Sequence, residues 1–547
     1  MVTLPSRGSG SHQTSESSRS SECWRIPRRN RLESLAFAII AIVALLPPPS
    51  AAAQEPKPTE DDYYRLVTLP LPQDAVLEVG GLEWLDESKN RLLICTRRGE
   101  VWVLDNAYAD DPQAGLHRDE TPPDGVPEEN VVRFQRMLFG LHEPLGMLRQ
   151  AGASYADGIY LAQRSELTRI NDTDGDDRID IVSTVCNQWE ISGSYHEYAF
   201  GPKLDRQGRM WITLNRPFGG EPEGKAKWRG WAITVDKRGQ MQTQCTGLRS
   251  PAGLGANADG DMFYTDNQGD WVAVCKLSHM KPGSFQGNPL ALVSCDDPQS
   301  TIKHPGEPPS GLKLAEAAEK YPAFMQPAVW FPYPRMGKSS SDILTDDTGG
   351  KFGPFAGQMF VGDQSTSIVS RVFLEKVDGE YQGACFPFRE RFQCGVMRMC
   401  WGRDGSMFVG QTNRGWGSAG GKPYGLERLV WSGETPFEVH QMRAAPDGFD
   451  LTFTMPVDAA TAGDAKSYSM KAWTYYYHSA YGCPPVDEHA LEVKSATIGD
   501  DGRSVHLVID GMKRGHVHAL RLDGVRAKSG LPVLHPEAYY TLNRLPR

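Results

Sequence analysis

His196 is the residue in this sequence with the most versatile chemistry, and it lies in the segment YHEYAFGP, residues 195–202. A histidine titrates near neutral pH, so a neutral imidazole can take the proton of a substrate hydroxyl. A lone histidine is also commonly a structural hydrogen-bonding group, and spacing alone does not separate the two roles. His196 is therefore a candidate general base whose role depends on where the fold places it.

A second group with possible chemistry is the segment NDTDGDDRID, residues 171–180, which gathers five aspartates around one glycine. These carboxylates repel one another unless a cation lies between them, and Ca²⁺ takes about six to eight oxygen ligands. The spacing resembles a calcium loop, although a full EF-hand would need a glutamate at its last position and flanking helices. The sequence predicts a calcium site formed by Asp172, Asp174, Asp176 and Asp180. The alternative is a solvated acidic turn.

A repeated strand pattern in residues 66–436 must position these groups. A glycine-containing turn, a short apolar strand, a polar turn and a second alternating strand recur six times. The copies contain Gly81, Gly158, Gly208, Gly260, Gly357 and Gly405. Their apolar strands include residues 92–95, 210–214 and 407–409, and residues 271–274 are expected to form the second strand of the fourth copy. Repeats of roughly 50 residues with short strands are typical of propeller blades, which must stack around a channel to bury their faces. The sequence predicts an all-β fold with a six-bladed β-propeller; the alternative is a set of unrelated hairpins.

The pattern changes after Glu438. Alternating strands are expected at residues 451–454, 468–477, 505–509 and 518–522, and glycine, threonine and proline at 433–436 mark a boundary. About 110 residues of this kind suit a small antiparallel sandwich. We expect residues 437–547 to form a β-sandwich of immunoglobulin or fibronectin type III kind.

The polar turn occurs at the same place in every repeat, so these turns should gather on one face of the propeller. Loops on a rigid scaffold commonly carry binding residues, although polar turns can also simply be solvated. The residues of these turns are Arg97, Arg98, Arg164, Asn215, Arg216, Asp266, Asn267, Gln268, Asp363, Gln364, Asn413 and Arg414. We expect several of them to line a binding funnel.

The first 53 residues resemble an export signal more than a part of the fold. A basic stretch, residues 25–31, precedes twelve apolar residues, 35–46, and a small-residue cleavage site at 50–53. Twelve residues are too few to cross the hydrocarbon core of a bilayer. We expect a secreted or periplasmic protein with no membrane span after signal removal. An uncleaved membrane anchor is the alternative, because the polar leader is long.

Charge and cysteine usage narrow the function classes. A net charge of −10 argues against nucleic acid or an anionic membrane as a general partner. The sequence contains no Cys-x-x-Cys-His, so no c-type haem is expected in this chain. Cys95 and Cys275 lie in apolar runs and are expected as buried thiols. Cys394 and Cys400 are a local disulfide candidate.

Over residues 66–436 the chain resembles the secreted glucose/sorbosone dehydrogenase-like propellers of bacteria. In characterised members a catalytic histidine stands shortly before an apolar-Gly-Pro strand, and His196 with residues 200–202 matches this position. Those members carry Arg-Asn-Pro-Gln-Gly near a quinone, whereas residues 249–253 here read RSPAG, without both amides. The resemblance implies that His196 takes a proton from a sugar hydroxyl while hydride passes to pyrroloquinoline quinone. It also implies that Arg249 holds carboxylates of that cofactor.

Further cofactor-binding candidates are Lys338, Asn267, Asn413 and Arg414. The leading hypothesis is an exported sugar or aldose dehydrogenase that passes electrons to a separate acceptor protein. The lost amides favour a second hypothesis, a non-catalytic module that binds a glycan or a protein. A third is a calcium-dependent lactonase-type hydrolase with a metal held through Asp266 and Asp363.

Overall fold

Short antiparallel strands make up nearly all the regular structure in the computed structural model, which describes residues 57–151, 155–218 and 226–547. The expected all-β class is confirmed. The only α-helices in these ranges are α1 (Glu60–Tyr63), α2 (Leu314–Lys320) and α3 (Ala459–Ala462). None of these described helices has the length and apolar character needed to span a membrane. The predicted export segment, residues 1–53, lies outside the described residues.

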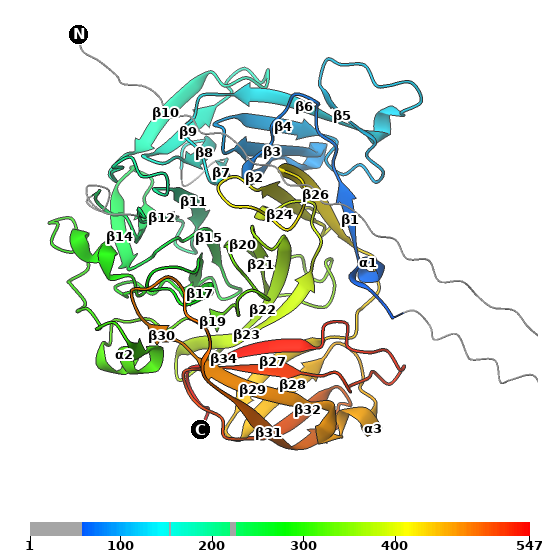
Figure 1. Cartoon of the computed structure of the whole chain (residues 1–547). Coiled ribbons are helices and arrows are strands. Elements are labelled where there is room, and N and C mark those ends of the chain that lie inside the picture. The colour runs from blue at the N-terminus through cyan, green and yellow to red at the C-terminus, as the bar shows by residue number, and fades with distance from the viewer. Residues whose placement is uncertain (1–56, 152–154, 219–225) are drawn as a thin grey trace, which may run out of the picture. The chain divides into compact units, whose positions relative to one another are not determined.

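Sheets are arranged around a common centre, as in a propeller (Figure 1). Their first strands are β2 (Val79–Asp86), β7 (Met147–Gln150), β11 (Ala199–Leu204), β15 (Gly253–Ala256), β20 (Ser340–Thr345) and β24 (Val396–Trp401). The second strands are β3 (Arg91–Thr96), β8 (Gly158–Ala162), β12 (Met210–Leu214), β16 (Met262–Asp266), β21 (Met359–Asp363) and β25 (Met407–Thr412). The first strands touch in a closed cycle, from β2 through β7, β11, β15, β20 and β24 back to β2.

Two further strands extend each sheet outward. The third strands are β4 (Val101–Asp105), β9 (Leu167–Asn171), β13 (Trp231–Val235), β17 (Lys276–His279), β22 (Ile368–Val377) and β26 (Tyr424–Trp431). The outer strands are β6 (Val131–Leu138), β10 (Ile181–Cys186), β14 (Met241–Thr246), β19 (Val329–Trp330), β23 (Glu380–Arg389) and β1 (Tyr64–Thr68). A short parallel strand, β5 (Ala114–His117), is added beyond β6. Five of the sheets are separate, whereas the sheet that begins with β20 continues into the C-terminal strands.

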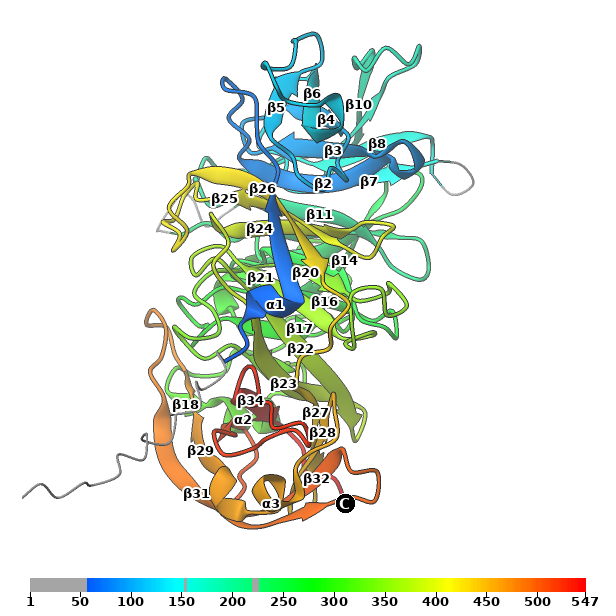
Figure 2. The ribbon, with the colours of Figure 1, turned by 90° about the vertical axis from the view of Figure 1, so that its right-hand side faces the viewer.

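Strand β1 closes the arrangement by pairing antiparallel with β26, so an N-terminal strand completes the last sheet (Figure 2). Such closure removes an exposed sheet edge, because the hydrogen-bonding groups of β26 find a partner. Sequence patterning did not predict this long-range pairing.

The C-terminal strands continue the sheet of β20–β23 edge to edge. The sheet runs on from β23 through β34 (Glu537–Leu542), β33 (His516–Arg521), β29 (Ser469–Thr474), β31 (Val486–Ile498), β32 (Ser504–Asp510) and β28 (Gly448–Phe453) to β27 (Val439–Ala445). These strands enclose a core that includes Phe449, Leu451 and Tyr540. Residues 57–547 belong to one compact unit. The short strands β18 (Leu312–Lys313) and β30 (Tyr476–Tyr477) pair with each other.

One predicted strand is wrong. Residues 271–274 form a turn, and the third strand of that sheet starts at Lys276. The apolar run is buried against the C-terminal segment: the Trp271 ring lies 4.8 Å from that of Tyr477, and its backbone nitrogen donates to the carbonyl of His478. These residues are therefore apolar because they are buried in a loop, and not because they form a strand.

The cysteines form no disulfide in the part of the chain that the structure describes, where nine are free thiols. Cys95 and Cys275 are fully buried, as expected. The candidate pair Cys394/Cys400 is not bonded. Cys394 lies just before β24 and Cys400 lies within it. An extended chain rises about 3.3 Å per residue, so the two cysteines are much farther apart than the roughly 7 Å between Cα atoms that a disulfide can bridge.

Candidate functional site

Two sets of turns meet at one end of the central axis. The first and second strands of each sheet are antiparallel, so the first strand begins at the edge where the second strand ends. The turn before each first strand therefore lies beside the turn after the second strand. We call this end the funnel face and define it by Arg97, Glu143, Arg164, His196, Arg249 and Arg414. The sequence predicted the turns after the second strands at this face, but it did not predict that the turns before the first strands lie there as well.

The axis beneath the funnel face is filled. A cavity of only about 10 Å³ remains among residues of all six first strands. Arg398 closes it, because its guanidinium donates to the carbonyls of Met397 at 2.6 Å, Leu145 at 3.1 Å and Ala252 at 3.3 Å. A ligand must therefore bind at the face instead of inside the channel.

A carboxylate shared by arginines organises one side of the funnel face. Glu143 accepts from Arg97 Nη2 at 2.6 Å and from Arg164 Nε at 3.0 Å, and Arg414 Nε lies 3.8 Å away. Arg414 also donates to Glu78 at 2.9 Å, and Arg97 donates to the Arg414 carbonyl at 2.7 Å. Turns of three sheets are thus cross-linked by charge-assisted hydrogen bonds, which are stronger than neutral ones.

His196 lies in a stack of flat side chains on this face. Its ring centroid is 4.2 Å from that of Phe218 and 5.7 Å from that of Trp416. Burial lowers the pKa of His196 below its usual value, and the cations Arg249 and Arg164 lower it further. No described residue forms a hydrogen bond with either ring nitrogen. The imidazole is therefore neutral near pH 7 and has a nitrogen available for a substrate hydroxyl.

Local hydrogen bonds hold the segment that presents His196. The buried carboxylate of Glu197 accepts from the backbone nitrogens of Ser192 and Gly193 and from the Ser192 hydroxyl. Asn215, from the turn after β12, donates its side-chain amide to the carbonyl of His196. These contacts fix the backbone on both sides of the ring.

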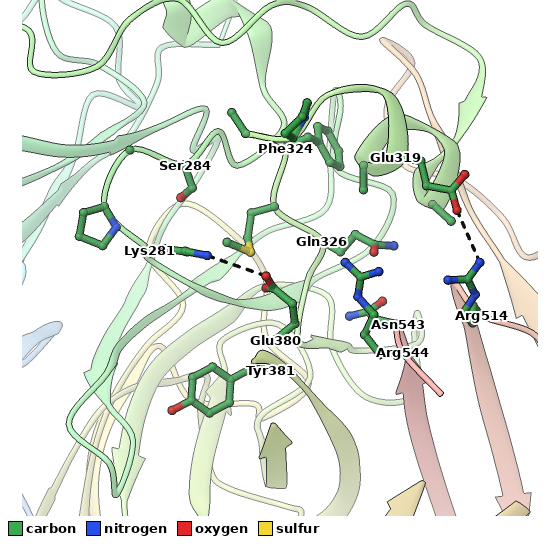
Figure 3. Close-up of a pocket in the computed structure, with 17 residues that line it drawn as sticks. Lys281, Ser284, Glu319, Phe324, Gln326, Glu380, Tyr381, Arg514, Asn543 and Arg544 are labelled. Carbon is green, nitrogen blue, oxygen red and sulfur yellow. Dashed lines mark ion pairs between the residues drawn. The ribbon is translucent and has the colours of Figure 1, made fainter. Parts of the chain in front are cut away.

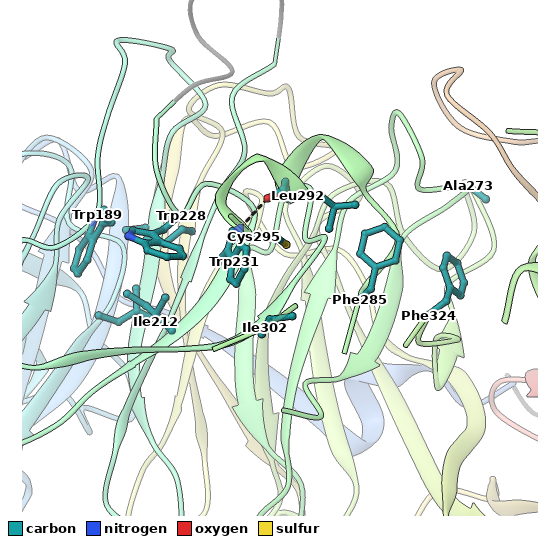
Figure 4. Close-up of a cluster of buried hydrophobic side chains, with 14 of the residues drawn as sticks. Trp189, Ile212, Trp228, Trp231, Ala273, Phe285, Leu292, Cys295, Ile302 and Phe324 are labelled. Atoms are coloured by element: carbon teal, nitrogen blue, oxygen red, sulfur yellow. Dashed lines mark hydrogen bonds between the residues drawn. The ribbon is translucent and has the colours of Figure 1, made fainter. Parts of the chain in front are cut away.

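A tryptophan-rich core lies behind the same segment (Figure 4). Trp228 packs edge-on against Trp231, whose indole nitrogen donates to the Ala291 carbonyl at 2.8 Å. Trp189, which belongs to this core, and the buried Arg229 both donate to the carbonyl of Arg164, at 2.9 and 2.7 Å. Burial lowers the pKa of Arg229 to about 9. The apolar core thereby holds a turn of the funnel face in place.

Arg249 stands on the other side of Phe218. Its guanidinium lies 4.1 Å from the Phe218 ring centroid and 5.4 Å from that of Tyr481, and its Nε donates to Asp270 at 2.7 Å. A side chain at Gly269 would collide with the guanidinium, at 1.9 Å from its carbon. Neither terminal nitrogen is used in a hydrogen bond among the described residues. Arg249 therefore has two donors left for a carboxylate ligand.

The other predicted cofactor-binding residues form no hydrogen bond, ion pair or ring contact with His196 in the described ranges. Lys338 is exposed, with its nitrogen 5.6 Å from the Tyr333 ring centroid. Asn267 donates to the Ser339 hydroxyl, and the side chain of Asn413 makes no hydrogen bond in the described ranges. Arg98 is exposed and outside the Glu143 group.

Asp266 and Asp363 are buried and hold turns together. Asp266 accepts from the backbone nitrogens of Arg249 and Ser250, and Asp363 accepts from those of Lys338 and Ser339. Their oxygens are engaged by the backbone, which does not favour a metal held between them.

The acidic loop brings three of its four predicted ligands together. One carboxylate oxygen each from Asp172, Asp174 and Asp176 lies within 4.8 Å of the others. Asp180 instead accepts from the backbone nitrogen and hydroxyl of Thr173, at 2.7 and 2.6 Å. The fifth aspartate, Asp177, turns away and pairs with arginines of the first sheet.

Sequence reasoning missed Glu143 of the funnel face and three aromatic residues that lie against His196 or Arg249: Phe218, Trp416 and Tyr481. Glu143 precedes a first strand just as His196 does, so the position of His196 within its repeat could have indicated it. Trp416 follows Arg414 in the turn after β25, and its backbone nitrogen donates to the Asn413 carbonyl. Tyr481 comes from the C-terminal strands, and no local signal in the sequence could have linked it to this face.

A larger cavity, of about 450 Å³, involves none of the residues that define the funnel face (Figure 3). Its charged residues include two ion pairs, Lys281 with Glu380 at 3.8 Å and Arg514 with Glu319 at 3.7 Å. The candidate site remains the funnel face, because His196 and Arg249 lie there on either side of Phe218, with ring nitrogens and terminal guanidinium nitrogens that have no partner among the described residues.

No family model and no curated protein matches the sequence. Among solved structures, the fold is similar to a putative oxidoreductase (glucose dehydrogenase) from Thermus thermophilus, at 15% identity, with a TM-score of 0.45, over 67% of this chain and 100% of that one. It is also similar to the PQQ-bound aldose sugar dehydrogenase of Streptomyces coelicolor, at 12% identity, with a TM-score of 0.42, over 69% and 100% of the chains. A third is the pyranose dehydrogenase PQQ domain of Coprinopsis cinerea, at 10% identity, with a TM-score of 0.41, over 69% and 98%. At such identities and scores, any activity must be inferred from the site itself.

Proposed function

We propose that this chain is an exported sugar dehydrogenase in which His196 acts as the general base at the funnel face. The observation that carries the proposal is a neutral, solvent-reachable imidazole, with no described partner at its ring nitrogens, in one stack with Arg249. A base of lowered pKa accepts a hydroxyl proton without first having to lose its own. The adjoining Trp416 ring offers an apolar surface for the C–H face of a sugar.

The residues present fit a planar, carboxylate-bearing quinone such as pyrroloquinoline quinone. The two unengaged nitrogens of Arg249 suit a carboxylate, and aromatic rings suit a flat ring system. Phe218 and Tyr481 both lie against the guanidinium of Arg249, which leaves its terminal nitrogens as the donors for such a group. When bound, a quinone supplies two-electron acceptance, which lets the sugar carbon give up hydride as His196 Nδ1 or Nε2 takes the hydroxyl proton. Electrons would then leave to a separate acceptor protein.

Three further interpretations, two of the fold and one of export, belong to the same proposal. The closed cycle of first strands supports counting β20–β23 as a sixth blade of the propeller. Strand β31 pairs with β29 through residues 486–491 and with β32 through residues 492–498, and the C-terminal strands enclose buried apolar side chains, which supports a β-sandwich made of residues 437–547. The basic, apolar and small-residue stretches of residues 1–53 support export.

A non-catalytic glycan-binding or protein-binding propeller is the competing function. Ser250 and Ala252 favour it, because the dehydrogenases that this chain resembles have asparagine and glutamine, with side-chain amides, at these two positions. Sugar-dependent reduction of a dye by quinone-treated protein separates the two: activity that requires His196 supports the dehydrogenase. Sugar binding without any dye reduction would support the binding module.

We also propose that the acidic loop binds Ca²⁺ through Asp172, Asp174 and Asp176. Adding Ca²⁺ is expected to raise the melting temperature by mass action, because only the folded loop collects the ligands. Asp174→Asn should abolish the increase. Asp501→Asn, which alters an exposed turn aspartate elsewhere, should preserve it. An unchanged melting temperature in wild-type protein, measured by differential scanning fluorimetry, would indicate a solvated acidic turn.

A further inference from the structure

Five flat side chains form a continuous row across the funnel face. In order they are Tyr481, Arg249, Phe218, His196 and Trp416. Successive spacings are 5.4, 4.1, 4.2 and 5.7 Å, so each group is in contact with the next. We call this set the aromatic row. It continues on both sides of His196, and Arg249 and Phe218 separate its end at Tyr481 from His196.

The two ends of the aromatic row are exposed large aromatics. Trp416 is 46% exposed and Tyr481 is 72% exposed, although most large apolar side chains in the described ranges are buried. Exposed aromatic groups at the rim of a polar site are typical of ligand contact, because their faces pack on apolar surfaces while their edges stay solvated. The C–H face of a pyranose ring is such a surface.

Tyr481 is held in place although its side chain is exposed. The segment that carries it comes from the C-terminal strands and is fastened to the turn after β16 by backbone hydrogen bonds. Gly482 donates to the carbonyl of Gly269 at 3.0 Å, and Cys483 donates to that of Ala273 at 2.8 Å. A backbone that is fixed in advance reduces the conformational freedom that is lost when a ligand binds.

From this geometry we infer that the sugar substrate of the funnel face is an oligosaccharide, and that Tyr481 binds a sugar unit beyond the one at His196. The inference rests on the proposed function for the position of the reacting unit. It adds the substrate class, a glycan chain of several units, and a role for the C-terminal region in chain-length specificity. A free monosaccharide would occupy only the part of the aromatic row near His196 and Trp416.

Calorimetric titration of the purified, full-length protein with glucose, cellotriose, cellohexaose, maltotriose and maltohexaose tests this inference. In one of the two series, affinity is expected to rise with chain length. Tyr481→Ala should lower the affinity for the long sugar by about tenfold, the loss of one aromatic platform, and so remove the gain with length. Tyr481→Phe should retain the gain.

The matched control is Tyr476→Ala. Tyr476 is also an exposed tyrosine, on strand β30 of the same C-terminal segment, but it lies outside the aromatic row. This variant should keep the dependence on length. Equal affinity at all lengths, no binding of any sugar, or a gain that survives Tyr481→Ala would overturn the inference. Length-dependent binding without sugar oxidation would support the oligosaccharide inference and contradict only the proposed dehydrogenase activity. Oxidation of glucose without length dependence would support the dehydrogenase activity and contradict the oligosaccharide inference.

Discussion

Replacing His196 by glutamine is expected to lower kcat for sugar oxidation by about 10²- to 10⁴-fold, the contribution of a positioned general base. Glutamine fills similar space and can still contact Phe218 and Trp416, so the stack around position 196 should persist. The loss should therefore appear in kcat more than in sugar affinity. Steady-state dye reduction with quinone-treated protein measures both quantities.

His142→Gln is the matched control. His142 also lies beside the Glu143 group, and burial and Arg164 lower its pKa as well, but it makes no ring contact with Phe218 or Trp416. Its replacement should leave kcat within about twofold. An equal loss in both variants would show that the effect comes from a disturbed arginine cluster and not from a base at position 196.

The pH dependence has a defined sign. Because burial and the nearby cations lower the pKa of His196 below 6.5, kcat should rise with pH below that value and be level near neutrality. In Arg249→Gln, measured at saturating quinone, loss of a cation should raise this pKa and move the acid limb to higher pH. An acid limb that stays in place would contradict the coupling between the two residues.

Glu143→Gln is expected to destabilise the protein by several kcal/mol. Arg97 and Arg164 are nearly buried and would lose their shared carboxylate, and breaking a buried ion pair commonly costs about 3–5 kcal/mol. Urea unfolding followed by tryptophan fluorescence measures the change in free energy. Glu128→Gln, which breaks an exposed pair with Arg133, should cost far less, because water solvates both partners. Similar values for the two variants would contradict the structural role assigned to Glu143.

The strands could be predicted from the sequence because each carries its own alternation and its own flanking turn. Predicted strands at 92–95, 210–214 and 407–409 lie within β3, β12 and β25. The error at residues 271–274 has a different origin, since these apolar residues are buried by the C-terminal segment, which is more than 200 positions away in sequence.

The site could be predicted only in part. His196 and Arg249 could be selected because both stand before first strands in a motif that resembles known enzymes. Glu143 occupies the equivalent position one sheet earlier, but nothing in its own segment shows that two arginines converge on it. Tyr481 reaches the funnel face only through tertiary pairing. Lys338 was selected by position in the chain, and its turn points it to solvent.

Titration with pyrroloquinoline quinone, followed by absorbance and melting temperature, tests the central claim most directly. We expect saturable binding to wild-type protein, a raised melting temperature, and affinity weakened by at least about tenfold in Arg249→Ala. Arg98→Ala, which removes an exposed arginine outside the Glu143 group, should bind like wild-type. Absence of saturable binding, or equal affinity in Arg249→Ala and wild-type, would contradict a quinone-dependent dehydrogenase at the funnel face.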